Sequence, residues 1–232
     1  METRQFDVPR YLSVLPLFAA LQPTELQRLA TGCRLRRFTR GEMVFSVGQP
    51  CEEFHVTVTG QVKLFALSPA GQEKVIELCG PGTSFAEALM FTGRPYIVSA
   101  QALTDSLLLS VGKAAVVSEI EADARFAMRM LAGISRRLHG LVHDVQAYAL
   151  HSGLQRVIGY LLRDVESEEP AAGGVITVSL PVSKATIASR LSLTPEYFSR
   201  VLHELEAAGL IEIDKRDIRI LDAARLAAYQ PD

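Results

Sequence analysis

The stretch IASRLSLTPEYFSRVLHEL, from Ile187 to Leu205, contains a short apolar helical pattern, a break and a second helical pattern. Thr194 can accept a hydrogen bond from the free backbone N–H groups that begin a helix, and Pro195 suits the next position because it has no N–H. Four apolar residues then follow at the i, i+3, i+4, i+7 spacing of an amphipathic helix: Phe198, Val201, Leu202 and Leu205. The stretch therefore predicts two helices joined by a tight turn, with the second starting at Thr194.

The opposite face of this second helix carries polar side chains. Glu196, Ser199 and Arg200 fall there, in the N-terminal half that a helix-turn-helix inserts into the major groove. A carboxylate accepts from the cytosine amino group, a guanidinium donates twice to guanine, and a hydroxyl serves either kind of edge. These three residues are therefore candidate base-reading residues. The alternative is a surface ion pair between Glu196 and Arg200, which the same i,i+4 spacing allows.

The residues after this helix complete a recognisable unit. Gly209 ends the helix, and LIEIDKRDIRIL predicts two short strands around the polar turn 214–217, which form a wing. Helix, helix and wing together indicate a DNA-binding domain, which we place at residues 149–232. Further candidate DNA contacts are Thr194, Ser183 and Lys184. The net charge of −2 gives no general attraction to nucleic acid, so DNA binding must rest on a local surface.

Residues 118–148 predict one long helix, since no proline occurs between Pro95 and Pro170. Apolar residues recur there at alternating steps of four and three: Ile120, Ala124, Ala127, Leu131, Ile134, Leu138, Leu141, Val145 and Tyr148. Such a repeat is typical of a coiled-coil seam, so we expect a homodimer. The central seam residues are Leu131, Ile134, Leu138, Leu141 and Val145. The alternative is that this helix buries its stripe against the β-domain of its own chain.

From about Leu35 to Leu109, short β-type segments alternate with glycine turns. A period of two runs through Val56, Val58, Val62 and Leu64. Glycines occupy turn positions between the segments, at 41, 48, 60, 71, 80 and 82. This pattern is typical of a mostly antiparallel sandwich or barrel. We place this domain, with its N-terminal helices, at residues 1–117.

The composition narrows the class of protein. Of the 232 residues, 48% are hydrophobic and 22% charged, as in ordinary globular proteins, and no segment approaches the roughly 18 apolar residues that span a bilayer. The N-terminus lacks an apolar signal core, so we expect a cytoplasmic protein with no membrane partner. Cys33, Cys51 and Cys79 lack C-x2-C spacing, and we interpret them as reduced thiols, with a redox or metal role as the alternative. We expect no enzyme, because the sequence contains no Ser/His/Asp constellation or phosphate-cradling loop.

The chain resembles the CRP/FNR family, that of the cyclic-AMP receptor protein and the fumarate-nitrate reduction regulator, over nearly all its length. The motifs that carry the resemblance are GEMVFSVGQP (41–50), FHVTVTGQVKL (54–64), FAEALMF (85–91) and SKATIASRLSLTPEYFSRVLHELEAAGLI (183–211). The resemblance implies an α+β fold: an N-terminal cyclic-nucleotide-binding-type β-roll, a long dimerisation helix and a C-terminal winged helix-turn-helix. The pattern Glu196, Ser199, Arg200 looks like the branch that reads a TTGAT half-site and its inverted repeat. Double-stranded DNA, a second copy of the chain and RNA polymerase are the implied partners.

The resemblance also allows each known class of effector to be considered. An oxygen-sensing iron–sulfur cluster needs an N-terminal cysteine cluster, and residues 1–32 contain no cysteine, so we expect no such cluster. Cyclic AMP needs a Gly-Glu-Leu segment followed by an arginine and a hydroxyl residue. Here Ala86 replaces the glycine, Glu87 is retained, and Tyr96 and Ile97 stand where the arginine and its neighbour belong. A buried phosphate without a cation is costly, which disfavours cyclic AMP, although Arg94 could substitute.

The sequence looks most like the dissimilatory nitrate respiration regulators (Dnr type), which are thought to sense nitric oxide through haem. This resemblance implies haem as the cofactor and an apolar effector pocket lined by Phe85, Glu87, Met90 and Phe91. The haem ligand stays open: His139 and His143 are candidates on the long helix, whereas His55 is expected to face solvent. Alternatives are a cyclic-nucleotide-responsive or effector-independent regulator of the same family, or a sensor module with vestigial DNA binding.

Overall fold

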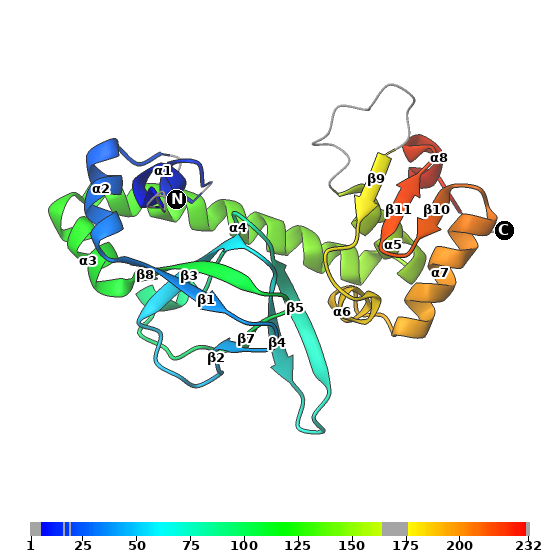
Figure 1. Ribbon diagram of the computed structural model, residues 1–232, viewed down its shortest axis with the longest axis horizontal. Coiled ribbons are helices and arrows are strands. Elements are labelled where there is room, and N and C mark those ends of the chain that lie inside the picture. The colour runs from blue at the N-terminus through cyan, green and yellow to red at the C-terminus, as the bar shows by residue number, and fades with distance from the viewer. Residues whose placement is uncertain (1–5, 16, 19, 164–175, 231–232) are drawn as a thin grey trace, which may run out of the picture. The chain divides into compact units, whose positions relative to one another are not determined.

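A computed structural model describes residues 6–15, 17–18, 20–163 and 176–230. The side chains at positions 136, 137, 140, 141, 143, 144, 147, 148 and 149 are not described, so those of the seam residue Leu141 and of the candidate ligand His143 lie outside the description. The chain forms two compact units (Figure 1). The first contains the residues up to Leu141 except Gln72–Lys74, and the second contains Gln72–Lys74 and the residues from Val142 onward.

The first unit contains short helices at both ends of a β-domain. In chain order its elements are α1 (Val8–Ser13), α2 (Pro23–Thr31), β1 (Cys33–Phe38), β2 (Met43–Phe45), β3 (Glu53–Thr59), β4 (Val62–Leu67), β5 (Glu73–Cys79), β6 (Ser84–Phe85), the 3-10 turn η1 (Leu89–Phe91), β7 (Ser99–Ala102), β8 (Ser106–Gly112) and α3 (Lys113–Ala122). The strands form two four-stranded sheets, in the orders β1-β8-β3-β6 and β2-β7-β4-β5. Strand β3 pairs antiparallel with β8 and β6, and β7 pairs antiparallel with β2 and β4. The predicted antiparallel β-domain is confirmed.

Strand β3 is covered on both faces. Phe54 points toward Phe18, with the ring centroids 6.1 Å apart, whereas His55 lies on the other face beside Phe45, 5.7 Å away. Both Phe54 and His55 are buried. The expectation that His55 faces solvent is therefore wrong. A period of two distinguishes buried from exposed residues only when one face of a sheet meets water, and here the face of β3 that carries His55 lies against Phe45 of the other sheet, inside the β-roll.

The expected single helix over 118–148 is divided in the structure. Helix α3 ends at Ala122 and α4 spans Ala124–Leu150, with Asp123 in an extended conformation between them. The Asp123 carboxylate accepts a hydrogen bond from the backbone N–H of Arg125 at 2.9 Å, as an N-cap residue does. Ile120, the first residue of the expected stripe, consequently belongs to α3.

Helix α4 presents two different apolar surfaces. Phe126 and Met130 are buried in the core of the first unit, and Ile134 is partly buried against that core. Three seam residues are instead exposed in the single chain, at 54% for Leu131, 58% for Leu138 and 65% for Val145. Packing against the β-domain of the same chain therefore accounts for Ile134 but leaves these three side chains uncovered.

The second unit is a winged helix-turn-helix. After the end of α4 it contains α5 (Gly153–Leu162), β9 (Ile176–Ser179), α6 (Lys184–Arg190), α7 (Pro195–Ala207), β10 (Ile211–Asp214), β11 (Asp217–Ile220) and α8 (Ala223–Ala227). The strands form one sheet in the order β10-β11-β9, so the predicted wing hairpin gains a third strand, β9, that the sequence pattern did not predict. The core includes apolar residues from α5, α6 and α7, among them Leu154, Val157, Leu161, Ile187, Phe198 and Leu202. Among the helices that the structure describes, none combines the length and the apolar composition that a membrane span needs.

Candidate functional site

The turn between α6 and α7 is built by local hydrogen bonds. Ser192 adopts a left-handed conformation with φ of 57°, and the N–H of Leu193 donates to the carbonyl oxygen of Ala188 at 2.9 Å. A left-handed residue reverses the chain direction in a very short distance. Arg156 of α5 also supports this turn, because its Nη1 donates to the carbonyl oxygen of Leu191 at 2.7 Å.

Helix α7 begins where the sequence predicts. The Oγ1 atom of Thr194 accepts a hydrogen bond from the N–H of Tyr197 at 3.2 Å, and Pro195 occupies the first helical position. At the start of α6, Ser183 has the same role, since its Oγ accepts from the N–H of Thr186 at 3.2 Å. The candidate DNA contacts Thr194 and Ser183 are therefore exposed helix caps, and half-buried Lys184 is the first residue of α6. Capping of this kind stabilises a helix start by about 1 kcal/mol.

The two faces of α7 are oriented as predicted. Phe198, Val201, Leu202 and Leu205 are buried, at 0–1% exposure. On the other side, Glu196 and Arg200 are exposed and Ser199 is half-buried. The first turns of α7 therefore present a carboxylate, a hydroxyl and a guanidinium on a helix whose inner face is fixed by the core.

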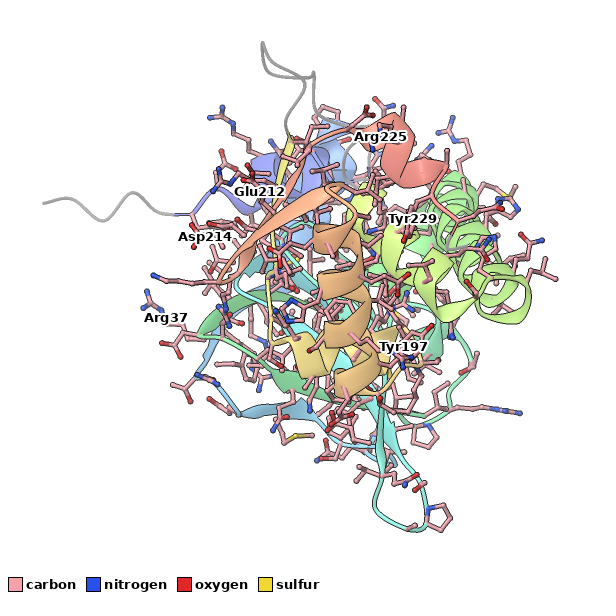
Figure 2. The ribbon with its side chains drawn as sticks, turned by 90° about the vertical axis from the view of Figure 1, so that its right-hand side faces the viewer. Arg37, Tyr197, Glu212, Asp214, Arg225 and Tyr229 are labelled. Atoms are coloured by element: carbon pink, nitrogen blue, oxygen red, sulfur yellow. The ribbon has the colours of Figure 1, made fainter. Side chains whose placement is uncertain are left out.

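The ion pair considered as an alternative for this face is not formed between the described side chains of Glu196 and Arg200. Instead, the guanidinium carbon of Arg200 lies 4.8 Å from the ring centroid of Tyr197. Figure 2 shows Tyr197 at the N-terminal end of α7. Tyr197 was not among the residues predicted from the sequence. The signal that could have found it is its position three residues before Arg200, the spacing at which side chains on a helix meet.

The wing is attached to the end of α7. Glu206 accepts a hydrogen bond from the N–H of Ile213 on β10 at 3.0 Å. Across the hairpin, Arg219 forms an ion pair with Glu212 at 3.2 Å, and Lys215 turns the chain with φ of 55°. Glu212 and Asp214 lie along β10 in Figure 2. The wing therefore contacts the C-terminal end of α7, while α5 supports the turn before α7.

The four residues predicted for the effector pocket are not all inside the β-roll. Phe85, Glu87 and Met90 are buried at 0–2% exposure, whereas Phe91 is 44% exposed. Phe91 directly follows Met90 in the 3-10 turn η1, where consecutive side chains project in different directions, so it does not share the buried environment of Met90. Ala86 adopts φ of 69°, a left-handed conformation that favours glycine, at the position where the resemblance expects a glycine. Ser84 donates to Glu87 at 3.4 Å.

Aromatic side chains fill the interior of the β-roll. The rings of Phe45 and Tyr96 are stacked with centroids 3.7 Å apart, and Phe85 lies 6.1 Å from Phe45 and 5.3 Å from His55. Tyr96 is 4% exposed and donates its hydroxyl to the carbonyl oxygen of Glu53 at 2.7 Å. Burial raises the pKa of Tyr96 well above its ordinary value. This position, where a phosphate-binding arginine would be needed, therefore holds a neutral stacked ring.

The other positions near the expected phosphate site are directed to the surface. Ile97 is 65% exposed, and Arg94 is exposed as well. Neither Tyr96 nor Ile97 supplies the cation that a buried cyclic phosphate requires, and the Tyr96 hydroxyl donates to the carbonyl oxygen of Glu53.

His55 supplies a buried imidazole in this interior. Its Nδ1 lies 2.9 Å from the Oγ of Ser110, and burial, with the nearby charge of Arg36, lowers its pKa to about 3. A neutral imidazole is the donor type that haem iron takes, and the aromatic lining matches an apolar macrocycle. The donor chemistry therefore fits haem, but the stacked rings must separate before a macrocycle can enter. His139 is exposed on α4.

Comparison with known proteins identifies both units. Residues 35–123 match the model of the cyclic nucleotide-binding domain, and residues 155–229 match the Crp-like helix-turn-helix domain. The CRP-like cAMP-activated global transcriptional regulator of Mycobacterium tuberculosis is 24% identical over 211 residues, which cover 91% of this chain and 94% of that protein.

Two solved structures agree with this match. DNR from Pseudomonas aeruginosa is 34% identical, with 97% of this chain and 100% of that chain covered and a TM-score of 0.54. FixK2 from Bradyrhizobium japonicum is 22% identical and shares the fold with a TM-score of 0.75 over 86% of this chain and 98% of that chain. Homologues of this chain are transcription regulators and not enzymes. The chain belongs to the CRP/FNR family of effector-responsive, DNA-binding transcription regulators.

Proposed function

We propose that the protein is a homodimeric regulator that reads a TTGAT-like palindrome and is controlled by an effector at its β-roll. The observation that carries the DNA-reading part is the outer face of α7. Glu196 and Arg200 are exposed there, Ser199 lies between them, and a capped helix start with a buried inner face holds all three. A two-fold dimer would place two such helices on half-sites one helical turn apart, about 34 Å.

The exposed stripe of α4 supports the homodimer. Leu131, Leu138 and Val145 follow each other at intervals of one heptad and are more than half exposed in the single chain. Apolar side chains at this repeat bury themselves against the same residues of a second copy. The resemblance to the CRP/FNR family also implies RNA polymerase, which we propose as the protein partner.

The role of this stripe in dimerisation can be tested by size-exclusion chromatography with light scattering, which measures the mass of the purified full chain. Leu138→Glu would place a charge on each side of the seam, where an unpaired buried charge costs about 3–5 kcal/mol. We expect this variant to elute as a monomer at concentrations where the unchanged protein is dimeric. Gln146→Glu introduces the same charge at an exposed position of α4 outside the seam and serves as the control. A dimeric Leu138→Glu protein would contradict the proposed seam.

The DNA target can be tested by fluorescence anisotropy. The probe duplexes carry either the TTGAT palindrome or a version in which adenine replaces the guanine of each half-site. Arg200→Ala should reduce the discrimination between these duplexes by about 1–3 kcal/mol for each bidentate hydrogen-bond pair that the substitution removes. Arg10→Ala removes an exposed arginine from α1 and should leave discrimination unchanged. Equal discrimination by Arg200→Ala and the unchanged protein would exclude Arg200 as the base-reading residue.

Haem with nitric oxide is the effector that we propose. The support is the resemblance of the sensor motifs to Dnr-type regulators and the donor chemistry of the interior, where Phe85 and Met90 would line the group and His55 would offer its imidazole. Bound haem would supply an iron atom that takes nitric oxide as a ligand. Because the rings must separate, the effector would bind one arrangement of the β-roll more tightly than another, as a switch requires.

An anaerobic titration with haem and then nitric oxide tests this assignment through the Soret band. Stoichiometric binding with a shift on nitric oxide supports the proposal, and loss of binding in His55→Ala but not in His139→Ala identifies the imidazole. An absence of saturable binding contradicts the haem assignment. It would favour an effector-independent regulator, for which the stacked interior of Phe45 and Tyr96 is the specific observation.

A further inference from the structure

We propose that Tyr197 is a specificity-determining positioning residue. Its ring is held between Gly153 of α5 and Arg200 of α7, and it orients the base-reading guanidinium according to the position of α5. This inference rests on the proposed base-reading role of Arg200. It adds the residue that would connect the end of the long helix to the recognition surface.

The first contact is between the ring and the guanidinium. Arg200 lies three residues after Tyr197, and its guanidinium carbon is 4.8 Å from the ring centroid. A cation over the face of an aromatic ring is attracted by it. An exposed arginine otherwise samples many rotamers, and fixing it on DNA costs conformational entropy. A ring that already holds the guanidinium on the outer face of α7 reduces this cost.

The second contact is between the ring and the backbone of α5. A Cβ atom added to Gly153 would lie 2.6 Å from Cε1 of Tyr197, 2.8 Å from the hydroxyl oxygen and 2.9 Å from Cζ. Side-chain atoms do not pack this closely, so the ring occupies the space that any other residue at position 153 would need. The glycine at this position therefore permits a close approach between α5 and the ring.

Gly153 also lies at a junction. It is the first residue of α5, its preceding residue Ser152 caps the helix in a capping box with Gln155, and α4 ends at Leu150. A shift of α5 would move the surface against which the Tyr197 ring rests. Arg156 links the same helix to the turn before α7 through its bond to Leu191. Helix α5 therefore contacts both the turn and the first residues of the recognition helix.

A Tyr197 ring that only filled space would affect different measurements from a ring that positions Arg200. Its removal would lower the stability of the second unit and weaken binding to every duplex equally. A ring that positions Arg200 affects the discrimination between duplexes, and only while Arg200 is present. The two roles are therefore separable by a double-mutant cycle on the full-length protein.

The first experiment measures discrimination between the TTGAT palindrome and its adenine-substituted version for Tyr197→Thr, Tyr197→Phe, Arg200→Ala and the double variant Tyr197→Thr/Arg200→Ala. Tyr197→Phe keeps the ring face and should discriminate like the unchanged protein. Tyr197→Thr should reduce the discrimination by about 2- to 5-fold, the size expected for one cation–π contact at a partly exposed site. The double variant should discriminate like Arg200→Ala alone.

The second experiment uses the glycine. Gly153→Ala should displace the ring and reproduce the reduction expected for Tyr197→Thr, whereas the same substitution in the Tyr197→Thr protein should have no further effect on discrimination because the space is free. Thermal unfolding of each variant reports its folded fraction, so that only folded protein is compared. Undiminished discrimination by Tyr197→Thr would overturn the inference while leaving the role of Arg200 intact. The same holds if Tyr197→Thr reduces discrimination additively with Arg200→Ala or with Gly153→Ala. If Arg200→Ala itself keeps full discrimination, the proposed base reading fails and no guanidinium remains for Tyr197 to position.

Discussion

The outer face of α7 and the interior of the β-roll place their candidate functional residues in opposite environments. On α7, Glu196 and Arg200 are exposed, and the residues behind them are buried. In the β-roll, Phe85, Glu87 and Met90 are themselves buried, and Phe85 lies beside Phe45, whose ring is stacked on Tyr96. Substitutions on α7 should therefore change DNA binding with little effect on stability, whereas substitutions in the roll should change stability first.

The largest expected change in the free energy of unfolding comes from a substitution in the interior of the β-roll. Phe85→Ala removes a side chain with 0% exposure and should lower the free energy of unfolding of the first unit by about 3–5 kcal/mol. Phe91→Ala is the matched control, because Phe91 belongs to the same predicted pocket but is 44% exposed. Urea denaturation followed by circular dichroism measures both, and the two units are fitted as separate transitions. Equal destabilisation of the two variants would contradict the different burial of these residues.

The stability of the β-roll should also depend on pH, because His55 is buried in its interior. Its pKa falls to about 3 in the folded chain, below the ordinary value of 6.5, so the unfolded chain binds the extra proton between these values. Stability is full above about pH 6.5 and declines as the pH falls toward 3, by about 1.4 kcal/mol per pH unit for one proton.

Urea midpoints of the first unit at pH 6.5, 5.5 and 4.5 measure this dependence. His55→Asn should show a shallower decline than the unchanged protein, because its side chain takes up no proton on unfolding. His139→Asn removes an exposed histidine from α4 and should leave the decline unchanged. The assignment fails if His55→Asn follows the same pH dependence as the unchanged protein.

The start of α7 should show a smaller effect on stability. Thr194→Ala removes the hydrogen bond to the N–H of Tyr197 and should cost about 1 kcal/mol in the second unit. Thr194→Ser keeps the cap and should be close to neutral. Thermal unfolding distinguishes these two variants, and a Thr194→Ala protein as stable as Thr194→Ser would show that the cap is not needed.

The smallest stability change is expected on the base-reading face itself. Ser199→Ala removes a half-buried hydroxyl and should change the free energy of unfolding by less than about 0.5 kcal/mol, as surface substitutions usually do. It should still weaken binding to the TTGAT palindrome in the anisotropy assay if the hydroxyl contacts DNA. A large decrease in stability with unchanged DNA binding would contradict the expectation that substitutions on the outer face of α7 change DNA binding and not stability.

Helix α7 was predictable from local sequence signals alone. The cap at Thr194, the proline after it and the apolar spacing of Phe198, Val201, Leu202 and Leu205 are local properties, since they depend on hydrogen bonds and periodicity within a few residues. The wing hairpin and the antiparallel character of the β-domain were predictable for the same reason. These predictions needed no knowledge of what packs against each element.

Other features depend on contacts between segments far apart in the chain, and local sequence patterns did not predict them. His55 is buried because Phe45 of the other sheet lies against it, Phe91 is exposed although its neighbour Met90 is buried, and α3 and α4 are separated because Asp123 caps a new helix. The contact of Tyr197 with Gly153 joins residues from different helices, so no periodicity within either helix reveals it. Burial and contact at these positions depend on segments far apart in the chain, and that information exists only once the chain is folded.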